Sequence, residues 1–190
     1  MTADLESLRP PVGGWTTDHL DLLPEDGRRS ELVDGAMLLS LRGRTHQSIA
    51  ALLMVVLDED CPAGYDVTQA MGVRLDRDRF FIPDVLVTTA AAAAREPSRY
   101  EPHEVVLAVE IVSPSTRSID RVLKPALYAQ AGIPFHWRIE IEDEGLVVHT
   151  YKIDPVHEVY TETGRWTTFV DTGEPFPVNL PISRITPRRV

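Results

Sequence analysis

Two acidic residues lie in strongly apolar surroundings and are the first candidates for chemistry. Asp84 lies in the apolar segment 80–87, and Glu110 lies in the apolar segment 105–112. Burying a carboxylate is costly unless it is paired with a cation or binds a metal. Either acid alone could be structural, paired with an arginine or hydrogen-bonded to a turn. Together they favour a shared divalent cation, because hard cations bind carboxylate oxygens.

Further polar residues could act beside this pair. Lys124 stands at helical spacing from Asp120 and Tyr128. It could reach back over the strand end to hold an attacking water or neutralise a phosphate, or it could be a solvated helix residue. Glu31 could lie at the rim of the same site or pair with an arginine. His46 could touch the site, or it could cap or pack the helix that begins there.

A predicted hairpin gathers a basic cluster. The dipeptide Asp34-Gly35 between apolar runs is a strong hairpin signal, because both turn positions favour positive φ. A two-residue turn there places Arg29 opposite Ser40. The open end of the hairpin then holds four arginines: Arg28, Arg29, Arg42 and Arg44. They could anchor phosphate groups, and a solvated cluster is the equal alternative.

Helices and strands must position these side chains. Apolar periodicity predicts a helix over 45–57 with Thr45 as its cap. A second helix begins at Ser118 or Asp120 and ends before Gly132, with a bend at Lys124 caused by Pro125. Strands are predicted over 65–69, 71–76, 80–88, 105–112, 133–141, 145–152, 156–161 and 166–171, and a helical turn or two over 90–94. The prolines at 175, 177 and 181 predict an irregular tail.

The pattern indicates an α/β (α+β) fold. The segment 105–112 is apolar on both faces except at Glu110, as expected for the middle of a covered sheet. The prediction is a mixed β-sheet flanked by helices, with additional antiparallel strands toward the C-terminus. Residues 1–15 are expected to be a loose lead-in, and 16–190 a single domain.

Composition restricts the class of protein. The 190 residues are 43% hydrophobic, enough for one core without disulfides. No apolar run approaches the roughly 20 residues of a membrane span, and Cys61 is the only cysteine, which suits the reducing cytoplasm. The net charge of −10 argues against a protein that coats nucleic acid. A local basic patch or a bound metal could still make one part of the surface positive despite the negative net charge.

Other reaction classes lack their motifs. The six histidines show no zinc-ligand spacing, and no glycine-rich nucleotide-binding loop is present. Ser113 and Ser115 flank Pro114 rather than standing in the Gly-x-Ser-x-Gly motif of a serine hydrolase.

The ordered motifs resemble the Uma-2 family of bacterial proteins, described as "putative restriction endonucleases" and assigned to the PD-(D/E)XK nuclease superfamily. The resemblance runs from about residue 16 to residue 140. It is carried by Glu31-Leu32-Val33-Asp34-Gly35, His46, Pro83-Asp84, Glu110-Ile111-Val112-Ser113-Pro114-Ser115-Thr116, Asp120, Lys124, Tyr128, Ala131-Gly132-Ile133-Pro134 and Trp137.

The resemblance implies a restriction-endonuclease-like core and a divalent metal, Mg²⁺ (or Mn²⁺), bound by Asp84, Glu110 and the main-chain carbonyl of Ile111. The superfamily lysine usually follows the second acid by two residues, where this chain has Val112. The family places a lysine on the following helix instead, and Lys124 matches it.

Other family positions are matched less closely. Tyr128 and Glu31 match flanking positions. The usual Tyr-Trp pair is His136-Trp137 here and is followed by Glu140, a departure outside the expected metal site.

Two functions follow as hypotheses. The first is a metal-dependent endonuclease that hydrolyses DNA phosphodiester bonds, with Asp84, Glu110 and Lys124 as catalytic residues, acting as a homodimer on DNA as its transient substrate. The second is a non-enzymatic or regulatory partner-binding protein that retains the fold, suggested by the acidic balance and the lack of an added DNA-reading domain. Convergence of the three side chains around one space would favour the first.

Overall fold

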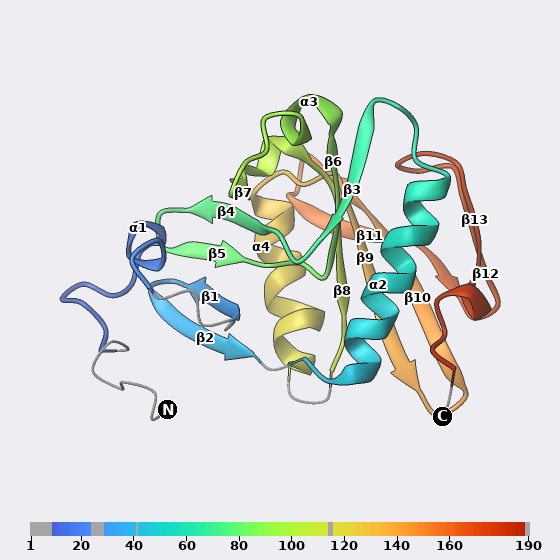
Figure 1. The fold of residues 1–190 in the computed structure, drawn as a ribbon, viewed down its shortest axis with the longest axis horizontal. Coiled ribbons are helices and arrows are strands. Elements are labelled where there is room, and N and C mark those ends of the chain that lie inside the picture. Colours follow the sequence, from blue (N-terminus) through green and yellow to red (C-terminus); the bar gives the residue numbers. More distant parts are fainter. Residues whose placement is uncertain (1–8, 24–28, 41, 114–115, 189–190) are drawn as a thin grey trace.

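A six-stranded mixed sheet forms the centre of the fold (Figure 1). This computed structural model describes residues 9–23, 29–40, 42–113 and 116–188. The sheet has the order β11-β10-β9-β8-β6-β3 and consists of β3 (Tyr65–Gln69), β6 (Val85–Thr89), β8 (Val105–Ile111), β9 (Phe135–Glu142), β10 (Gly145–Asp154) and β11 (Val159–Trp166). β8 and β9 are parallel and the other neighbours antiparallel, which confirms the predicted mixed sheet.

A five-stranded sheet lies beside it, in the order β2-β1-β5-β4-β7. Its strands are β1 (Arg29–Val33), β2 (Ala36–Ser40), β4 (Gly72–Asp76), β5 (Arg79–Phe81) and β7 (Arg99–Tyr100). Asp34 and Gly35 form the β1–β2 turn with φ of 47° and 77°. The register pairs Arg29 with Ser40, which confirms the predicted hairpin.

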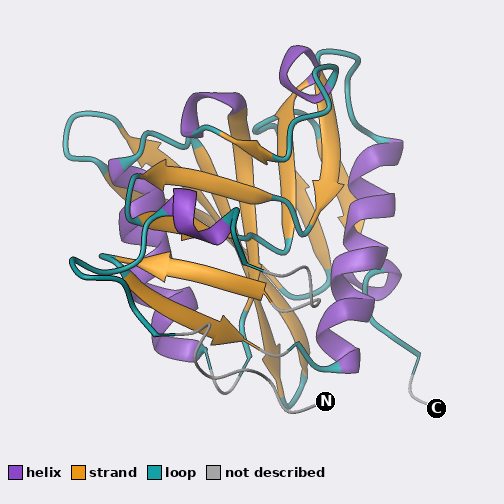
Figure 2. Cartoon of the chain, turned by 60° about the vertical axis from the view of Figure 1, so that its left-hand side comes forward, coloured by secondary structure: helices purple, strands orange, loops and turns teal. Residues whose placement is uncertain are grey.

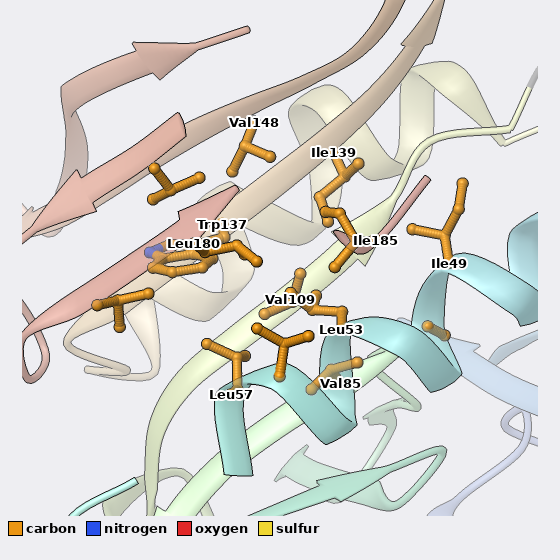
Figure 3. Packing of buried hydrophobic residues seen from close by; sticks show 14 of the residues in the cluster. Ile49, Leu53, Leu57, Val85, Val109, Trp137, Ile139, Val148, Leu180 and Ile185 are labelled. Atoms are coloured by element: carbon orange, nitrogen blue, oxygen red, sulfur yellow. The ribbon is translucent and has the colours of Figure 1, made fainter. Parts of the chain in front are cut away.

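Two helices cover opposite sides of β8, as Figures 1 and 2 show. α2 (Arg44–Glu59) packs Ile49, Leu53 and Leu57 into the larger core, against side chains of β6, β8 and β9. Figure 3 shows this packing around Val109 and Trp137. α4 (Lys124–Gln130) packs in a second core that also contains side chains of β5, β6 and β8.

The segment before α4 differs from a regular helix. A π-helical turn, η3 (Ile119–Leu123), precedes α4, and the Lys124 N–H donates to the carbonyl of Ile119. Pro125 has no N–H to donate to the carbonyl of Arg121 and its ring would crowd it, so a widened turn is favoured. The expected bend at Lys124 thus takes the form of a π-helical turn.

Several predicted boundaries were wrong. The single strand over 80–88 is divided by residues 82–84, so that β5 joins the small sheet and β6 the central one. The cap of α2 is Gly43 rather than Thr45, because the chain is extended at Gly43 and helical from Arg44. The strand expected over 156–161 is β11, Val159–Trp166.

The tail is more regular than expected. β12 (Phe169–Thr172) pairs with β13 (Val178–Pro181), and the short helix η4 (Ile182–Arg184) follows. Pro181 ends its strand, where the missing N–H does not interrupt the ladder. The short helices elsewhere are α1 (Thr17–Leu20), α3 (Ala90–Ala93) and η2 (Pro102–Glu104).

The expected lead-in is only partly separate from the core. Trp15 is buried, and its main-chain N–H donates to the carbonyl of Gly35. Residues 1–8 lie outside the described part of the chain. Among the helices that the structure describes, none is both long and apolar enough to cross a membrane.

Candidate active site

Asp84 lies between β5 and β6, where its carboxylate reaches the end of β8. Its N–H donates to the Val109 carbonyl (2.9 Å), and its Oδ2 accepts the N–H of Ile111 (2.8 Å). The side chain is 1% exposed. Burial would raise the pKa of Asp84, but a hydrogen bond from His46 and the charge of Arg42 hold it below its ordinary value. Asp84 is therefore an ionised, well-anchored carboxylate.

Glu110 lies near the end of β8 and is fully buried. Its Oε1 accepts the Tyr128 hydroxyl at 2.6 Å and the Lys124 ammonium at 3.0 Å. Its Oε2 has no hydrogen-bond partner among the described residues. Burial raises the pKa of Glu110 to about 8, with Lys124 opposing the rise and Asp84, Asp120 and Glu31 adding to it.

Lys124, on the first turn of α4, is enclosed by acids. Its Nζ lies 2.8 Å from Glu31, 3.0 Å from Glu110 and 3.7 Å from Asp120, and its side chain is 0% exposed. Burial lowers the pKa of Lys124, but these carboxylates outweigh burial and hold it above its ordinary value. The interpretation of Lys124 as a solvated residue is therefore wrong.

Glu31 and Asp120 complete this cluster. The Oε1 of Glu31 binds Lys124 and also accepts the N–H of Ile82 (2.9 Å). Asp120 is fully buried and accepts the Thr116 hydroxyl. Asp120 was not among the predicted site residues, although its position four residues before Lys124 on one helical face was the available signal.

Two of the four arginines reach the carboxylates. The Nη1 of Arg29 lies 3.5 Å from Asp84 Oδ1, and its Nη2 donates to the carbonyls of Ile82 and Pro83. The Nη2 of Arg42 lies 3.5 Å from Asp84 Oδ1 and 3.8 Å from Glu110 Oε2. Because the Arg42 side chain is only 3% exposed, the solvated-cluster interpretation is wrong for this residue.

The other two arginines do not join this group. Arg44 is exposed and lines a separate pocket of about 350 Å³ between α2 and the C-terminal segment. Arg28 lies outside the described residues.

His46 contacts the site from the first turn of α2. Its Nε2 lies 2.9 Å from the Ile111 carbonyl oxygen, 3.1 Å from Asp84 Oδ2 and 3.0 Å from Arg42 Nη1. A single ring nitrogen cannot donate to a carbonyl and accept from a guanidinium at once, so its tautomer decides which contact is a hydrogen bond. Its ring touches the expected ligand atom of Ile111.

The donor atoms suit a divalent metal. In the described part of the chain, no group of three or more His, Cys, Asp or Glu side chains is placed to hold a metal ion. The set implied by the resemblance needs only two carboxylates and the Ile111 carbonyl. The buried, unpartnered Glu110 Oε2 and the Asp84 Oδ1 that faces guanidinium nitrogens are hard oxygen donors of the kind Mg²⁺ prefers. The residues therefore fit such an ion once Arg42 makes room.

Comparisons with known proteins point to nucleases. The family model Uma2, described as "Putative restriction endonuclease", matches residues 17–169. Among solved structures, the chain is similar to "a putative nuclease belonging to DUF820" from Anabaena variabilis, with 18% identity, a TM-score of 0.68, and coverage of 90% of this chain and 97% of that one. At this identity the likeness shows a shared fold. Among curated proteins, none matches the chain.

Proposed function

The chain belongs to the Uma2 family, described as "Putative restriction endonuclease", and from that premise we propose that it is a metal-dependent endonuclease that hydrolyses DNA phosphodiester bonds. Family and fold support nuclease function in general. The dependence on a metal and the choice of DNA are our proposal. So are the assignment of Asp84, Glu110 and Lys124 as its catalytic residues and the homodimer as its working form.

The observation that carries the proposal is that the two oxygens of each carboxylate have different surroundings. One oxygen of Asp84 is anchored by the Ile111 N–H, and one oxygen of Glu110 is anchored by Lys124 and Tyr128. The second oxygen of each faces the same guanidinium nitrogen of Arg42. Two buried carboxylates that are each held on one side and share a cation on the other are arranged as metal ligands are.

Mg²⁺ or Mn²⁺ would be held by Asp84, Glu110 and the Ile111 carbonyl. When bound, such an ion lowers the pKa of a coordinated water and stabilises charge that develops on a phosphate. The chain's own residues prepare this site: main-chain bonds fix Asp84 on the end of β8, and Lys124 and Tyr128 orient Glu110.

Lys124 and Arg29 have different tasks in this proposal. Lys124 is enclosed by Glu31 and Glu110, so in this conformation it acts by holding Glu110 and by adding a fixed positive charge beside the reacting group. The Arg29 side chain is 21% exposed while its guanidinium touches Asp84, so it can contact a phosphate at the edge of the site. Both positive charges are fixed in place before the substrate arrives.

A non-enzymatic, partner-binding protein that retains the fold is the second candidate. The ion pairs that Arg42 makes with both acids favour it, because they would stabilise a metal-free protein without catalysis. The net charge of −10 also weakens general affinity for nucleic acid.

A nuclease assay separates the two candidates. Single-stranded DNA, duplex DNA and RNA are incubated with Mg²⁺, with Mn²⁺ and with chelator. We expect cleavage of DNA with either metal and none with chelator. Asp84→Asn should abolish cleavage, whereas the control Asp171→Asn, on an exposed position of β12, should leave it unchanged. Absence of cleavage by the wild type under all conditions would favour the non-enzymatic protein.

A further inference from the structure

Arg42 occupies the space between the two candidate metal ligands. Its Nη2 lies 3.5 Å from Asp84 Oδ1 and 3.8 Å from Glu110 Oε2. Lys124 binds Glu110 and Arg29 contacts Asp84, whereas Arg42 contacts both acids. Arg42 contacts Asp84 Oδ1 and Glu110 Oε2. In each acid, the main-chain, lysine or tyrosine donors of the described residues bind the other carboxylate oxygen.

Charge, rather than well-formed hydrogen bonds, holds the guanidinium against the two carboxylates, and its close polar contact is that of Nη1 with His46 Nε2 at 3.0 Å. Among the described residues, the buried Nε and Nη2 of Arg42 have no hydrogen-bond partner. Charge-assisted hydrogen bonds to carboxylates are about 2.7–2.9 Å long and often bidentate, so 3.5 and 3.8 Å are loose contacts. Mg²⁺ binds carboxylate oxygens at about 2.0–2.1 Å, so it would attract the same two oxygens more strongly than the guanidinium does.

We propose that the guanidinium of Arg42 and a divalent cation compete for the same pair of carboxylates, so that metal binding displaces Arg42. This inference rests on the proposed metal-dependent function. It explains how the two buried acids are stabilised when no metal is bound. The four buried acids, Asp84, Glu110, Glu31 and Asp120, face three cations, Arg29, Arg42 and Lys124.

The formal charge of this group supports an exchange rather than an addition. With all four acids ionised, as a bound metal requires of its ligands Asp84 and Glu110, four negative and three positive charges sum to −1, and replacing Arg42 by a divalent ion brings the sum to zero. Adding the ion while Arg42 stays would give +1 and place two cations within a few ångströms of each other, which repel strongly where little water screens them.

The position of Arg42 in the chain permits the movement. Arg42 follows β2 and precedes Gly43, the cap of α2, so it belongs to neither element. Its side chain can therefore leave the carboxylates without unwinding a helix or a strand. The released guanidinium remains tethered beside the metal site, where it can contact a phosphate of the bound substrate.

Metal affinity of charge-removing variants tests the competition. Arg42→Met keeps most of the length of the side chain but not its charge, and Arg44→Met removes the same charge from an exposed position two residues away. Calorimetric titration with Mn²⁺ should show a dissociation constant at least about tenfold lower for Arg42→Met than for the wild type. Arg44→Met should stay within about twofold, since water and salt screen an exposed charge.

Thermal denaturation gives a second readout that does not depend on activity. In chelator, Arg42→Met should melt below the wild type, because its two acids lose their shared counter-ion. With saturating Mn²⁺ the difference should shrink or reverse, because the metal then takes the place of that counter-ion. Circular dichroism establishes that the variants are folded, and Arg42→Gln replaces Arg42→Met if the latter is not.

The outcomes separate this inference from the proposed function. If the wild type binds Mn²⁺ and folded Arg42→Met or Arg42→Gln binds it no more tightly, the competition is overturned and the metal site stands. If only the variant binds Mn²⁺, the competition is supported in its strongest form. If neither binds, the metal site itself is overturned together with the competition.

In the wild type, saturating Mg²⁺ should also shift the Nε–H resonance of Arg42 in an NMR spectrum, and an unchanged resonance contradicts displacement.

Discussion

Tyr128 donates its hydroxyl to Glu110 Oε1 over 2.6 Å, although both side chains are fully buried. The ring of Tyr128 packs edge-on against Phe81, with centroids 5.7 Å apart. Burial and the charge of Glu110 raise the pKa of Tyr128, so its hydroxyl remains a donor. A core tyrosine therefore fixes which oxygen of Glu110 is left for a cation.

Tyr128→Phe should keep the packing and remove this donor. Above about pH 8, where Glu110 is ionised and the bond reaches a charged acceptor, we expect a loss of about 1.5–3 kcal/mol in the free energy of unfolding, measured by urea denaturation. Metal affinity should fall several-fold, since Glu110 is less well oriented. Tyr160→Phe is the matched control, because its hydroxyl donates to the neutral carbonyl of Ile133. Equal effects of the two variants on metal affinity would contradict the orienting role of Tyr128.

Lys124→Met should destabilise the metal-free protein severely. The substitution leaves Glu31, Glu110 and Asp120 buried without the cation that they share. Breaking a buried ion pair in this way costs about 3–5 kcal/mol. Arg121→Met, one turn earlier, removes a half-exposed partner of Glu140 and should cost at most about 1 kcal/mol in the same denaturation experiment. A loss for Lys124→Met as small as for Arg121→Met would show that Lys124 is not the counter-ion on which these acids depend.

Much of the site could be predicted because burying a charge is expensive. Asp84 and Glu110 stand out as acids in apolar strands, and the structure places both at the end of β8. The register of the first hairpin follows from Asp34-Gly35, whose positive φ angles suit a tight turn. These features depend on neighbouring residues and on local backbone preference.

Contacts between distant segments could not be predicted in the same way. Arg42 pairs with Asp84 because its place between β2 and α2 brings it to the end of β8, and that placement depends on the packing of both sheets. Proline content predicted an irregular tail, but β13 forms because its apolar side chains Val178 and Leu180 pack into the larger core. Tertiary packing overrides a local signal in this segment.

The protein should form a homodimer in solution. Apolar side chains remain exposed on several elements, including Leu39 on β2 and Leu52 and Val55 on α2. Covering such surface is a common reason for association. Light scattering at micromolar concentration should give about twice the 21.2 kDa chain mass. A mass near that of one chain would exclude the dimer.

Arg29→Met should weaken DNA binding equally for all sequences. A phosphate contact carries no sequence information, and losing one flattens the slope of log affinity against log salt by about 0.9. Binding is measured in chelator, where no cleavage is expected. Arg184→Met, which loses a surface contact with Glu59 at the far end of α2, should leave the slope unchanged. Equal slopes for Arg29→Met and the wild type would remove Arg29 from the phosphate contacts.

Stability of the metal-free protein should fall as the pH rises toward 8. Burial raises the pKa of Glu110 from 4.5 to about 8, so the folded state keeps a proton that the unfolded chain releases between these values. Because the folded state binds more protons, stability decreases with pH in this window. Asp84 has the opposite effect. Its pKa is lowered from 3.8, so its contribution to the stability of the folded state is present above pH 3.8 and is lost as the pH falls below that value. Glu110→Gln should flatten the melting temperature between pH 4.5 and 8.

Metal binding should release the proton of Glu110, since a carboxylate must be ionised to be a ligand. Below about pH 8, the dissociation constant for Mn²⁺ should therefore fall about tenfold for each unit by which the pH rises. At higher pH the dissociation constant should become constant. Calorimetry at neutral pH in two buffers of different ionisation enthalpy should show about one proton released per ion bound. A dissociation constant that does not change with pH in this range would mean that Lys124 and Tyr128 outweigh burial and keep Glu110 ionised. The raised pKa would then be wrong, while the geometry of the site would be unaffected.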